Sequence, residues 1–374
     1  MRLAFCLYKY FPFGGLERNF VAVANECIKR GHIIDGFSME WQGEVPVGIK
    51  AHRVPVKGLS NHKRVASFVS WISSNLARDD YDLVIGFNKM PLLDLYYAAD
   101  VCYVERVRHQ RGKWARFTPR YRIFSRLEES VFGRSSDTHI VYISNKEKAI
   151  YQAVYGTPED RFHYAPPGVN KALIRQVINK DCRDKIRKEL GLSPDDIFLL
   201  MVGSNFATKG VDRSIKALAS LPDNLRSVTH LVVVGKGKEK RFRRLAVRLG
   251  VNEKVHFMGG RDDVPRFLAG ADFLLQPSVN ENTGNAIVEA LVAGLPVLTT
   301  ENCGFAEHVS NAKAGVVVPA SPFDQNVMNK MLADMLLSGS KDLWRQNALL
   351  YSDTYDLYNR ISVIADLIEE IASN

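Results

Sequence analysis

Two glutamates, Glu281 and Glu289, stand eight positions apart around a predicted loop-to-helix junction. They follow a predicted strand, Phe273–Gln276, and Gly284 between them lets the backbone approach a ligand closely. Carboxylates accept paired hydrogen bonds from vicinal hydroxyls, so this layout suits a sugar, a diphosphate and a ribose in line. The ordinary alternative is two solvated glutamates around a helix start, where acidic residues are common.

The first turn of this predicted helix contains Asn285, Ala286 and Ile287. We expect their backbone amides to be free donors, because the first turn of a helix has no partners for its N–H groups. Free amides and the helix dipole together favour anions, so we predict an anion site at this helix start.

The composition limits the classes of protein and partner. The chain has 374 residues, 46% of them hydrophobic and 24% charged, which is typical of a soluble globular protein of two domains. The net charge of +9 favours an anionic partner. Five scattered cysteines without a CxxC pair argue against disulfides and zinc and favour a reducing cytoplasm. No apolar run approaches the roughly 18 residues of a membrane span, and the N-terminus lacks a signal-peptide pattern.

Strands alternate with helices along most of the chain, which predicts an α/β fold with doubly wound parallel sheets. The predicted strands are residues 3–8, 33–37, 83–87, 139–143, 197–202, 231–235, 255–258, 273–276 and 297–299. Pro166-Pro167-Gly168 is the strongest break, and we place the domain boundary there. We predict an N-terminal acceptor-facing and membrane-facing domain over residues 1–165 and a nucleotide-sugar domain over residues 169–350, facing each other across a cleft. A C-terminal helix over residues 351–374 is expected to cross back to the first domain.

Several sequence blocks resemble a known family. The Glu-x7-Glu spacing, the Gly14-Gly15 loop and Gly203…Lys209-Gly210 resemble retaining nucleotide-sugar glycosyltransferases of the GT-B fold. LYKYFPFGGLERNF, GFNKMPLLDLYYAADVCY and KGVDRSIKALASLP resemble, more narrowly, the lipopolysaccharide-core glucosyltransferases, over essentially the whole chain. The resemblance implies transfer of glucose from UDP-glucose to an inner-core heptose of lipopolysaccharide.

The resemblance also implies roles for the donor site. Glu289 would hold the ribose hydroxyls, and Glu281 would hold the hydroxyls of the transferred sugar. Lys209 would pair with the diphosphate and stabilise the leaving UDP. Gly15 would let its loop close over the donor phosphates, and Arg261 would reach the nucleotide. The backbone of the loop and helix start would serve the sugar and diphosphate through Thr283, Gly284, Asn285, Ala286 and Ile287.

The sequence departs from this family at Ser204, where the broader family usually has an arginine. Lys171 and Arg175 are cations near the Pro-Pro-Gly break, and neither matches the family's position for a second arginine.

The resemblance implies a front-face substitution, in which the departing phosphate takes the acceptor's proton and no protein base is needed. A protein nucleophile with a covalent intermediate is the other route to retention. Asp100 is the one candidate for contact with the acceptor, and a turn or helix-end aspartate is its plain alternative.

Metal dependence has its own sequence test. Enzymes that neutralise a sugar diphosphate with Mg²⁺ or Mn²⁺ usually carry Asp-x-Asp at a strand end. Asp80-Tyr81-Asp82 has this spacing but precedes its predicted strand, Leu83–Phe87. We therefore predict no metal and no cofactor other than the donor substrate.

Residues 106–126 form a basic aromatic segment with eight Lys or Arg and no acidic residue. Four aromatic residues recur at helical spacing, although Pro119 should bend or break the helix. The segment predicts an in-plane membrane helix; a core-packed helix with a solvated basic face and an RNA-binding patch are the alternatives. The predicted membrane contacts are Arg106, Arg108, Lys113, Trp114, Arg116, Phe117, Arg120, Tyr121, Arg122, Phe124 and Arg126.

Together these observations predict a cytoplasmic enzyme attached peripherally to the inner leaflet of the bacterial inner membrane, with no nucleic-acid partner. The alternatives are a related transferase with another nucleotide sugar or glycolipid acceptor, and a non-catalytic protein that binds anionic lipid or RNA. The glutamate pair favours the enzyme, because two carboxylates would repel an anion bound for its charge alone.

Overall fold

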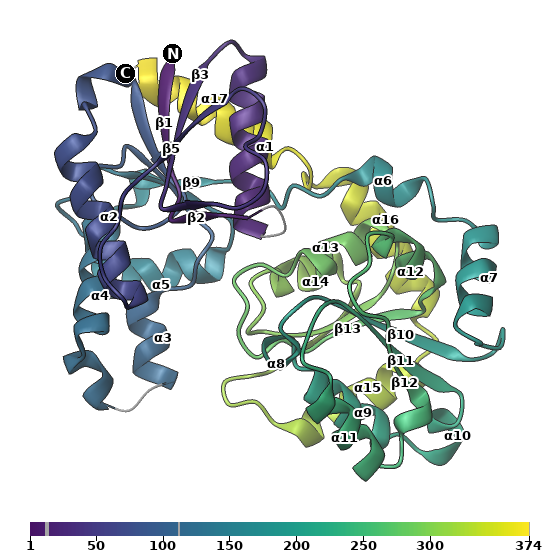
Figure 1. The fold of residues 1–374 in the computed structure, drawn as a ribbon. Helices are drawn as coiled ribbons and strands as arrows, with labels where there is room; N and C mark the ends of the chain where they lie inside the picture. The colour runs from purple at the N-terminus through teal and green to yellow at the C-terminus, as the bar shows by residue number, and fades with distance from the viewer. Residues whose placement is uncertain (12–14, 111–112, 374) are drawn as a thin grey trace. The chain divides into compact units, whose positions relative to one another are not determined.

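The computed structural model describes residues 1–11, 15–110 and 113–373 (Figure 1). The chain divides into two compact units. Unit 1 comprises Met1–Pro166 together with Asn359–Asn374, and unit 2 comprises Pro167–Tyr358.

Unit 1 is built on a seven-stranded sheet in which every pair of neighbours runs parallel. In spatial order its strands are β5 (Ile49–Arg53), β3 (Ile33–Ser38), β1 (Arg2–Cys6), β6 (Leu83–Gly86), β7 (Leu95–Ala98), β8 (His139–Tyr142) and β9 (Phe162–Tyr164). The strand order reverses between β1 and β6, which makes the carboxyl ends of these two strands the ligand-binding position typical of such sheets. β2 (Lys9–Tyr10) and β4 (Glu40–Trp41) form a separate small pair.

Alternate residues of the central strand β1 belong to two hydrophobic cores. The helices of unit 1 are α1 (Gly15–Lys29), α2 (Asn61–Asn75), α3 (Tyr103–Gln110), α4 (Pro119–Phe132), α5 (Asn145–Tyr155) and α17 (Arg360–Ser373). Its short 3-10 turns are η1 (Arg78–Asp80), η2 (Lys113–Phe117) and η3 (Glu159–Arg161). Leu3 and Phe5 lie in the core covered by α1 and α17, whereas Ala4 and Cys6 lie in the core covered by α2, α4 and α5.

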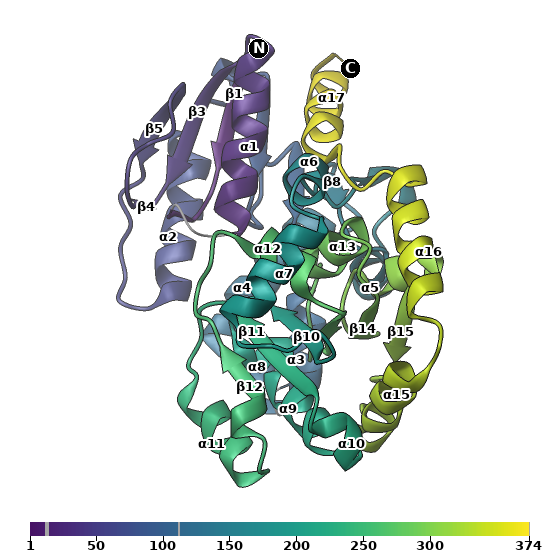
Figure 2. The ribbon, with the colours of Figure 1, turned by 90° about the vertical axis from the view of Figure 1, so that its right-hand side faces the viewer.

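The last helix, α17, returns to unit 1 as predicted, but it begins at Arg360, because residues 351–354 end the preceding helix. α17 lies along α1 (Figure 2), and Arg30 beside the end of α1 pairs with Asp366 and Glu369 of α17 at 2.7 and 3.0 Å. The preceding helix, α16 (Lys341–Thr354), belongs to unit 2, where it packs on α13.

Unit 2 has a six-stranded parallel sheet. In spatial order its strands are β12 (Val255–Phe257), β11 (Thr229–Val234), β10 (Ile197–Val202), β13 (Phe273–Gln276), β14 (Val297–Thr300) and β15 (Gly315–Val318). The strand order reverses between β10 and β13, so a second ligand-binding position is expected at their carboxyl ends.

Helices cover both faces of this sheet, which confirms the predicted doubly wound architecture. Besides α16, the helices of unit 2 are α6 (Lys171–Arg175), α7 (Lys180–Glu189), α8 (Phe206–Lys209), α9 (Val211–Ala219), α10 (Asp223–Arg226), α11 (Lys240–Arg248), α12 (Val264–Gly270), α13 (Asn285–Val292), α14 (Ala306–Ala312) and α15 (Gln325–Leu337), with a 3-10 turn η4 (Asn252–Lys254). One core includes residues of α7, α12, α13, α14 and α16, and the other includes residues of α9, α11 and α15.

Candidate functional site

The loops after β10 and β13 bring Lys209 and Glu281 into direct contact. Lys209 is the last residue of α8, and Glu281 lies in the loop that leads from β13 to α13. The Lys209 ammonium donates to the Glu281 carboxylate, and the two side chains are only 17% and 13% exposed. A cation and a carboxylate thus share the carboxyl edge of the sheet at the point where the strand order reverses.

Glu281 is held by its side chain and by its backbone. The Ser278 hydroxyl donates at 2.6 Å to Oε2, the carboxylate oxygen that does not accept from Lys209. The Glu281 N–H donates to Asn302 O at 3.1 Å, and the Gly304 N–H donates to Glu281 O at 2.8 Å. The carboxylate is therefore fixed in position before any ligand arrives.

Glycines make room for this pair. At Gly203, where φ is 140°, an added Cβ would lie 2.6 Å from Lys209 Cε. At Gly284, where φ is 106°, an added Cβ would lie 2.4 Å from Cys303 Sγ. Both positions combine a left-handed backbone with a close neighbour, so only glycine fits them.

The start of α13 differs in one respect from the predicted anion site. The Ile287 N–H donates to Gly284 O at 2.8 Å, so the expectation that this amide is a free donor is wrong. The reason is a tight first turn, in which an amide bonds a carbonyl three residues earlier. Asn285 is exposed, Ala286 and Ile287 are buried, and Glu289 lies half-buried one turn further along the helix.

The Thr283 carbonyl and the Cys303 thiol join the loop to the segment after β14. Thr283 O accepts from the Phe305 N–H at 2.9 Å and from Cys303 Sγ at 3.1 Å. Burial raises the pKa of the Cys303 thiol far above its usual range, so this sulfur stays a neutral packing and hydrogen-bonding group. No local sequence pattern indicates a role for Cys303, whereas Ser278 is recognisable as a hydroxyl three residues before Glu281.

Arg261 follows β12 and is engaged in ion pairs. Its guanidinium donates twice to the Asp263 carboxylate, at 2.8 Å each, and lies 3.6 Å from Glu189. The hydrogen bonds from Arg261 lower the pKa of Asp263 below its ordinary value. The structure does not bring Arg261 into contact with Glu281 or Lys209, and its contact with the nucleotide stays a prediction.

The two cations near the Pro-Pro-Gly break are occupied by α16. Lys171 pairs with Asp353 at 2.7 Å, and Arg175 pairs with the same carboxylate at 3.2 Å and donates to Ser352. These contacts hold α6 against α16, which gives both cations a structural role.

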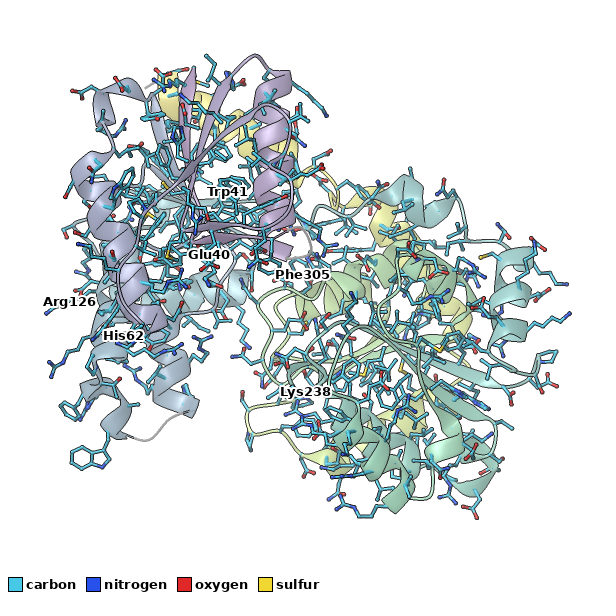
Figure 3. The ribbon with its side chains drawn as sticks, viewed as in Figure 1. Glu40, Trp41, His62, Arg126, Lys238 and Phe305 are labelled. Atoms are coloured by element: carbon cyan, nitrogen blue, oxygen red, sulfur yellow. The ribbon has the colours of Figure 1, made fainter. Side chains whose placement is uncertain are left out.

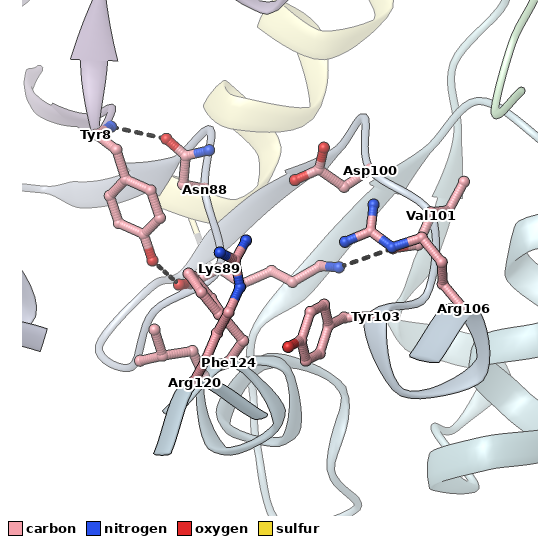
Figure 4. Close-up of a pocket in the computed structure, with 10 residues that line it drawn as sticks. Tyr8, Asn88, Lys89, Asp100, Val101, Tyr103, Arg106, Arg120 and Phe124 are labelled. Carbon is pink, nitrogen blue, oxygen red and sulfur yellow. Dashed lines mark hydrogen bonds between the residues drawn. The ribbon is translucent and has the colours of Figure 1, made fainter. Parts of the chain in front are cut away.

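The remaining predicted site residues belong to unit 1. Gly15 is the first residue of α1 and has open space around its Cα, whereas Gly14 lies outside the described residues. Asp100 is exposed after β7, and it lines a pocket together with residues that follow β1 and β6 and with side chains of α3 and α4 (Figure 4). Its backbone oxygen accepts from the Tyr151 hydroxyl at 3.0 Å.

The basic aromatic segment consists of α3, η2 and α4, and Pro119 begins α4 as a helix-breaking proline should. Its aromatic side chains divide into two groups. Trp114 and Phe117 are 83% and 55% exposed, whereas Tyr121 and Phe124 pack on the Tyr103 ring. The exposed basic side chains are Arg106, Arg108, Arg116, Arg120, Arg122 and Arg126, of which Arg126 is labelled in Figure 3; the Lys113 side chain lies outside the described residues.

Comparison with known proteins identifies the family of the chain. The family described as glycosyl transferases group 1 matches residues 182–348, and glycosyltransferase family 4 matches residues 13–173. The lipopolysaccharide glucosyltransferase WaaG of Escherichia coli (strain K12) is 43% identical over 371 residues, which cover 98% of both chains. The chain belongs to the lipopolysaccharide glucosyltransferase family.

This glycosyltransferase is also similar to solved structures. A crystal structure of WaaG aligns with a TM-score of 0.89 at 42% identity, covering 98% of this chain and 99% of that one. A structure of Anabaena Alr3699/HepE in complex with UDP and glucose aligns with a TM-score of 0.73 at 18% identity over 100% and 99% of the two chains. The two Rossmann-like sheets of the glycosyltransferase therefore form the GT-B fold.

Two properties of the described residues concern membranes and metals. None of the glycosyltransferase's helices in these residues is long and apolar enough to cross a membrane. Within the same ranges, no three His, Cys, Asp or Glu side chains gather in a way that could hold a metal ion.

Proposed function

We propose that this enzyme transfers glucose from UDP-glucose to an inner-core heptose of lipopolysaccharide, with retention of the anomeric configuration. The observation that carries the proposal is the Lys209–Glu281 pair at the carboxyl edge of unit 2, in a chain that matches a lipopolysaccharide glucosyltransferase along almost its whole length. A structure of the same fold holding UDP and glucose supports a donor of this class.

Each side chain of the proposed donor site has its own role. Glu281 accepts hydrogen bonds from the hydroxyls of the glucose, and its anchoring by Ser278 fixes which hydroxyls it meets. Lys209 exchanges Glu281 for the diphosphate, because two phosphates carry more charge than one carboxylate. In the same proposal Glu289 binds the ribose hydroxyls and Arg261 contacts the nucleotide. Gly15 lets its loop close over the donor phosphates.

The reaction is a front-face substitution. The acceptor oxygen attacks the anomeric carbon from the side on which UDP departs, and the bond between that carbon and the phosphate oxygen breaks. The acceptor's proton passes to the departing phosphate, so atoms and charge balance without a protein base. Lys209 stabilises the negative charge that grows on UDP, and we propose that no metal is required.

We also propose that the enzyme attaches peripherally to the inner leaflet of the inner membrane through the basic aromatic segment. Trp114 and Phe117 are apolar and exposed, and Arg116, Arg122 and Arg126 are exposed cations near them in the chain. Aromatic side chains insert at a membrane interface, and each cation near an anionic surface contributes about 1 kcal/mol.

The attachment is tested by flotation with vesicles that contain phosphatidylglycerol. The double variant Trp114→Ser/Phe117→Ser should lose most of its vesicle binding, whereas Leu59→Ser, which removes another exposed apolar side chain of unit 1, should bind as before. Equal binding by all three proteins would contradict the proposed contact.

Donor, acceptor and metal requirement are tested together by UDP release. We expect release from UDP-glucose only when a heptose-terminated core acceptor is present, with the same rate in EDTA and in Mg²⁺. Release from another UDP-sugar would replace glucose in the proposal, and loss of activity in EDTA would contradict metal independence. The anomeric configuration of the product, determined by NMR, decides between retention and inversion.

A further inference from the structure

Unit 1 has a pocket at the carboxyl ends of β1, β6 and β7, beside the point where its strand order reverses (Figure 4). Its volume is about 200 Å³, which is enough for a charged group and part of a sugar ring. Its charged side chains are three cations, Lys89 after β6, Arg106 of α3 and Arg120 of α4, and one carboxylate, Asp100.

The floor of the pocket is already neutral and rigid. The Lys89 ammonium donates to the buried Glu128 carboxylate at 2.6 Å and to Val101 O at 3.2 Å. Glu128 also accepts from the backbone N–H groups of Tyr103 and Val104 at 2.7 and 3.1 Å. Burial opposes ionisation of this carboxyl, but Lys89 and the two amides hold its pKa below the ordinary value.

The wall next to Asn88 is equally fixed. The Tyr8 N–H donates to Asn88 Oδ1 at 2.7 Å, and the Tyr8 hydroxyl donates to Lys89 O at 2.5 Å (Figure 4). These bonds tie the end of β1 to the end of β6, so the pocket exists before a ligand binds.

Lys89 is paired with Glu128, so the guanidiniums of Arg106 and Arg120 are the cations of the pocket that can bind a ligand. Arg106 stacks over the Tyr103 ring at 5.5 Å, and Arg120 stacks over the Phe124 ring at the same distance. Among the described residues, no carboxylate oxygen lies within 4.0 Å of either guanidinium, so neither of them forms an ion pair. The rings orient two planar cations whose hydrogen-bonding capacity is unused.

We propose that this pocket binds an anionic group, a carboxylate or a phosphate, carried by the acceptor saccharide. Arg106 and Arg120 are its ligands, because a guanidinium matches the two oxygens of such a group. Asp100 accepts from a hydroxyl of the same saccharide. The inference rests on the proposed function, and it removes Arg106 and Arg120 from the predicted membrane contacts.

The test is calorimetric titration of the whole protein, without donor, with two soluble saccharides. One is a heptose linked to a sugar that carries a carboxylate, and the other is its neutral methyl ester. We expect the acidic saccharide to bind the wild type at least about 10-fold more tightly than the ester, since a charge-assisted bond contributes roughly 1.5–3 kcal/mol. Arg106→Met and Arg120→Met should each remove most of that preference.

Arg53→Met is the matched control, because Arg53 is an exposed arginine of unit 1 at the end of β5 and does not line the pocket. It should bind both saccharides like the wild type. Equal affinity of the wild type for acid and ester, or an equal loss in all three variants, would overturn the proposal. Melting temperatures of the variants exclude unfolding as the cause.

Two further outcomes are informative. One distinguishes a saccharide anion from a lipid headgroup, and the other distinguishes failure of this proposal from failure of the proposed function. If Arg106→Met and Arg120→Met lose binding to phosphatidylglycerol vesicles but keep the acid preference, the ligand is a lipid headgroup and the acceptor assignment is wrong. If they lose the acid preference while the wild type transfers no glucose, the anion pocket stands and the proposed function fails.

Discussion

Replacement of Gly284 by alanine perturbs the donor site through one methyl group. Gly284 has a φ of 106°, and an added Cβ would lie 2.4 Å from Cys303 Sγ. A left-handed backbone costs a non-glycine residue roughly 1–2 kcal/mol, and overpacking a buried contact costs a further 1–3 kcal/mol or so. We expect Gly284→Ala to destabilise unit 2 by about 3 kcal/mol, and the melting temperature of such a unit to fall by roughly 6–12 °C.

The same methyl group displaces the loop that carries Glu281, so the donor affinity should fall as well. Differential scanning calorimetry measures the stability, and titration with UDP-glucose measures the affinity. Gly250→Ala is the control for backbone strain alone, because Gly250 has a φ of 69° and nothing within 4 Å of an added Cβ. The double variant Gly284→Ala/Cys303→Ala removes the close sulfur and should recover about half of the lost stability. A Gly284→Ala protein as stable as Gly250→Ala, with wild-type donor affinity, would refute the reasoning.

Three further changes test the surroundings of the site. Ser278→Ala removes the 2.6 Å bond to Glu281, so kcat/KM for glucosyl transfer should fall about 5-fold at unchanged melting temperature; unaltered kinetics would contradict the positioning role. Asp272, which is 4% exposed, receives three cationic side chains, so Asp272→Asn should cost about 3 kcal/mol of unfolding free energy in urea; a loss under about 0.5 kcal/mol would contradict this. Burial lowers the pKa of His308 to about 4, so the unfolded chain takes up a proton at higher pH than the folded one, and stability should fall as the pH drops from about 6.5 to about 4. His308→Phe should flatten that decline in calorimetric scans, and an unchanged slope would exclude His308 as its source.

Much of the fold follows from local sequence patterns. The apolar runs of β10, β11, β13 and β14 predicted buried parallel strands, and all four lie in the sheet of unit 2. Four strands of the two large sheets were not predicted, β5, β7, β9 and β15, and neither was the small pair of β2 and β4. The edge strand β5 has the sequence IKAHR and a single buried residue, so no continuous apolar run marks it, and β7, β9 and β15 are only three or four residues long.

The sequence allowed Lys209 and Glu281 to be named as candidate site residues, but it did not predict that their side chains contact each other. The loops after β10 and β13 share an edge because the two strands are neighbours, and this brings together Lys209 and Glu281, which are 72 positions apart. No local pattern encodes that pairing. Cys303 was missed for the same reason, since only the close approach of Gly284 gives the sulfur a role.

The basic aromatic segment illustrates the limit of periodicity. Spacing placed four aromatics on one stripe, yet the structure exposes Trp114 and Phe117 and packs Tyr121 and Phe124 on Tyr103. Tyr103 belongs to another helix, α3, and the fold alone determines which rings it covers. The alternative of a core-packed helix with a solvated basic face thus describes Tyr121 and Phe124, whereas membrane contact through the exposed Trp114 and Phe117 stays a prediction.

The most direct test of the account is the rate of glucosyl transfer from UDP-glucose to a heptose-terminated core acceptor by Glu281→Gln and Lys209→Met, with Lys238→Met as an exposed control. Glutamine keeps the shape of Glu281 but removes the charge that pairs with Lys209. We predict a loss of at least about 100-fold in kcat for both site variants, at wild-type melting temperature, and no loss in the control. Transfer by folded Glu281→Gln at the wild-type rate would contradict the assignment of the donor site.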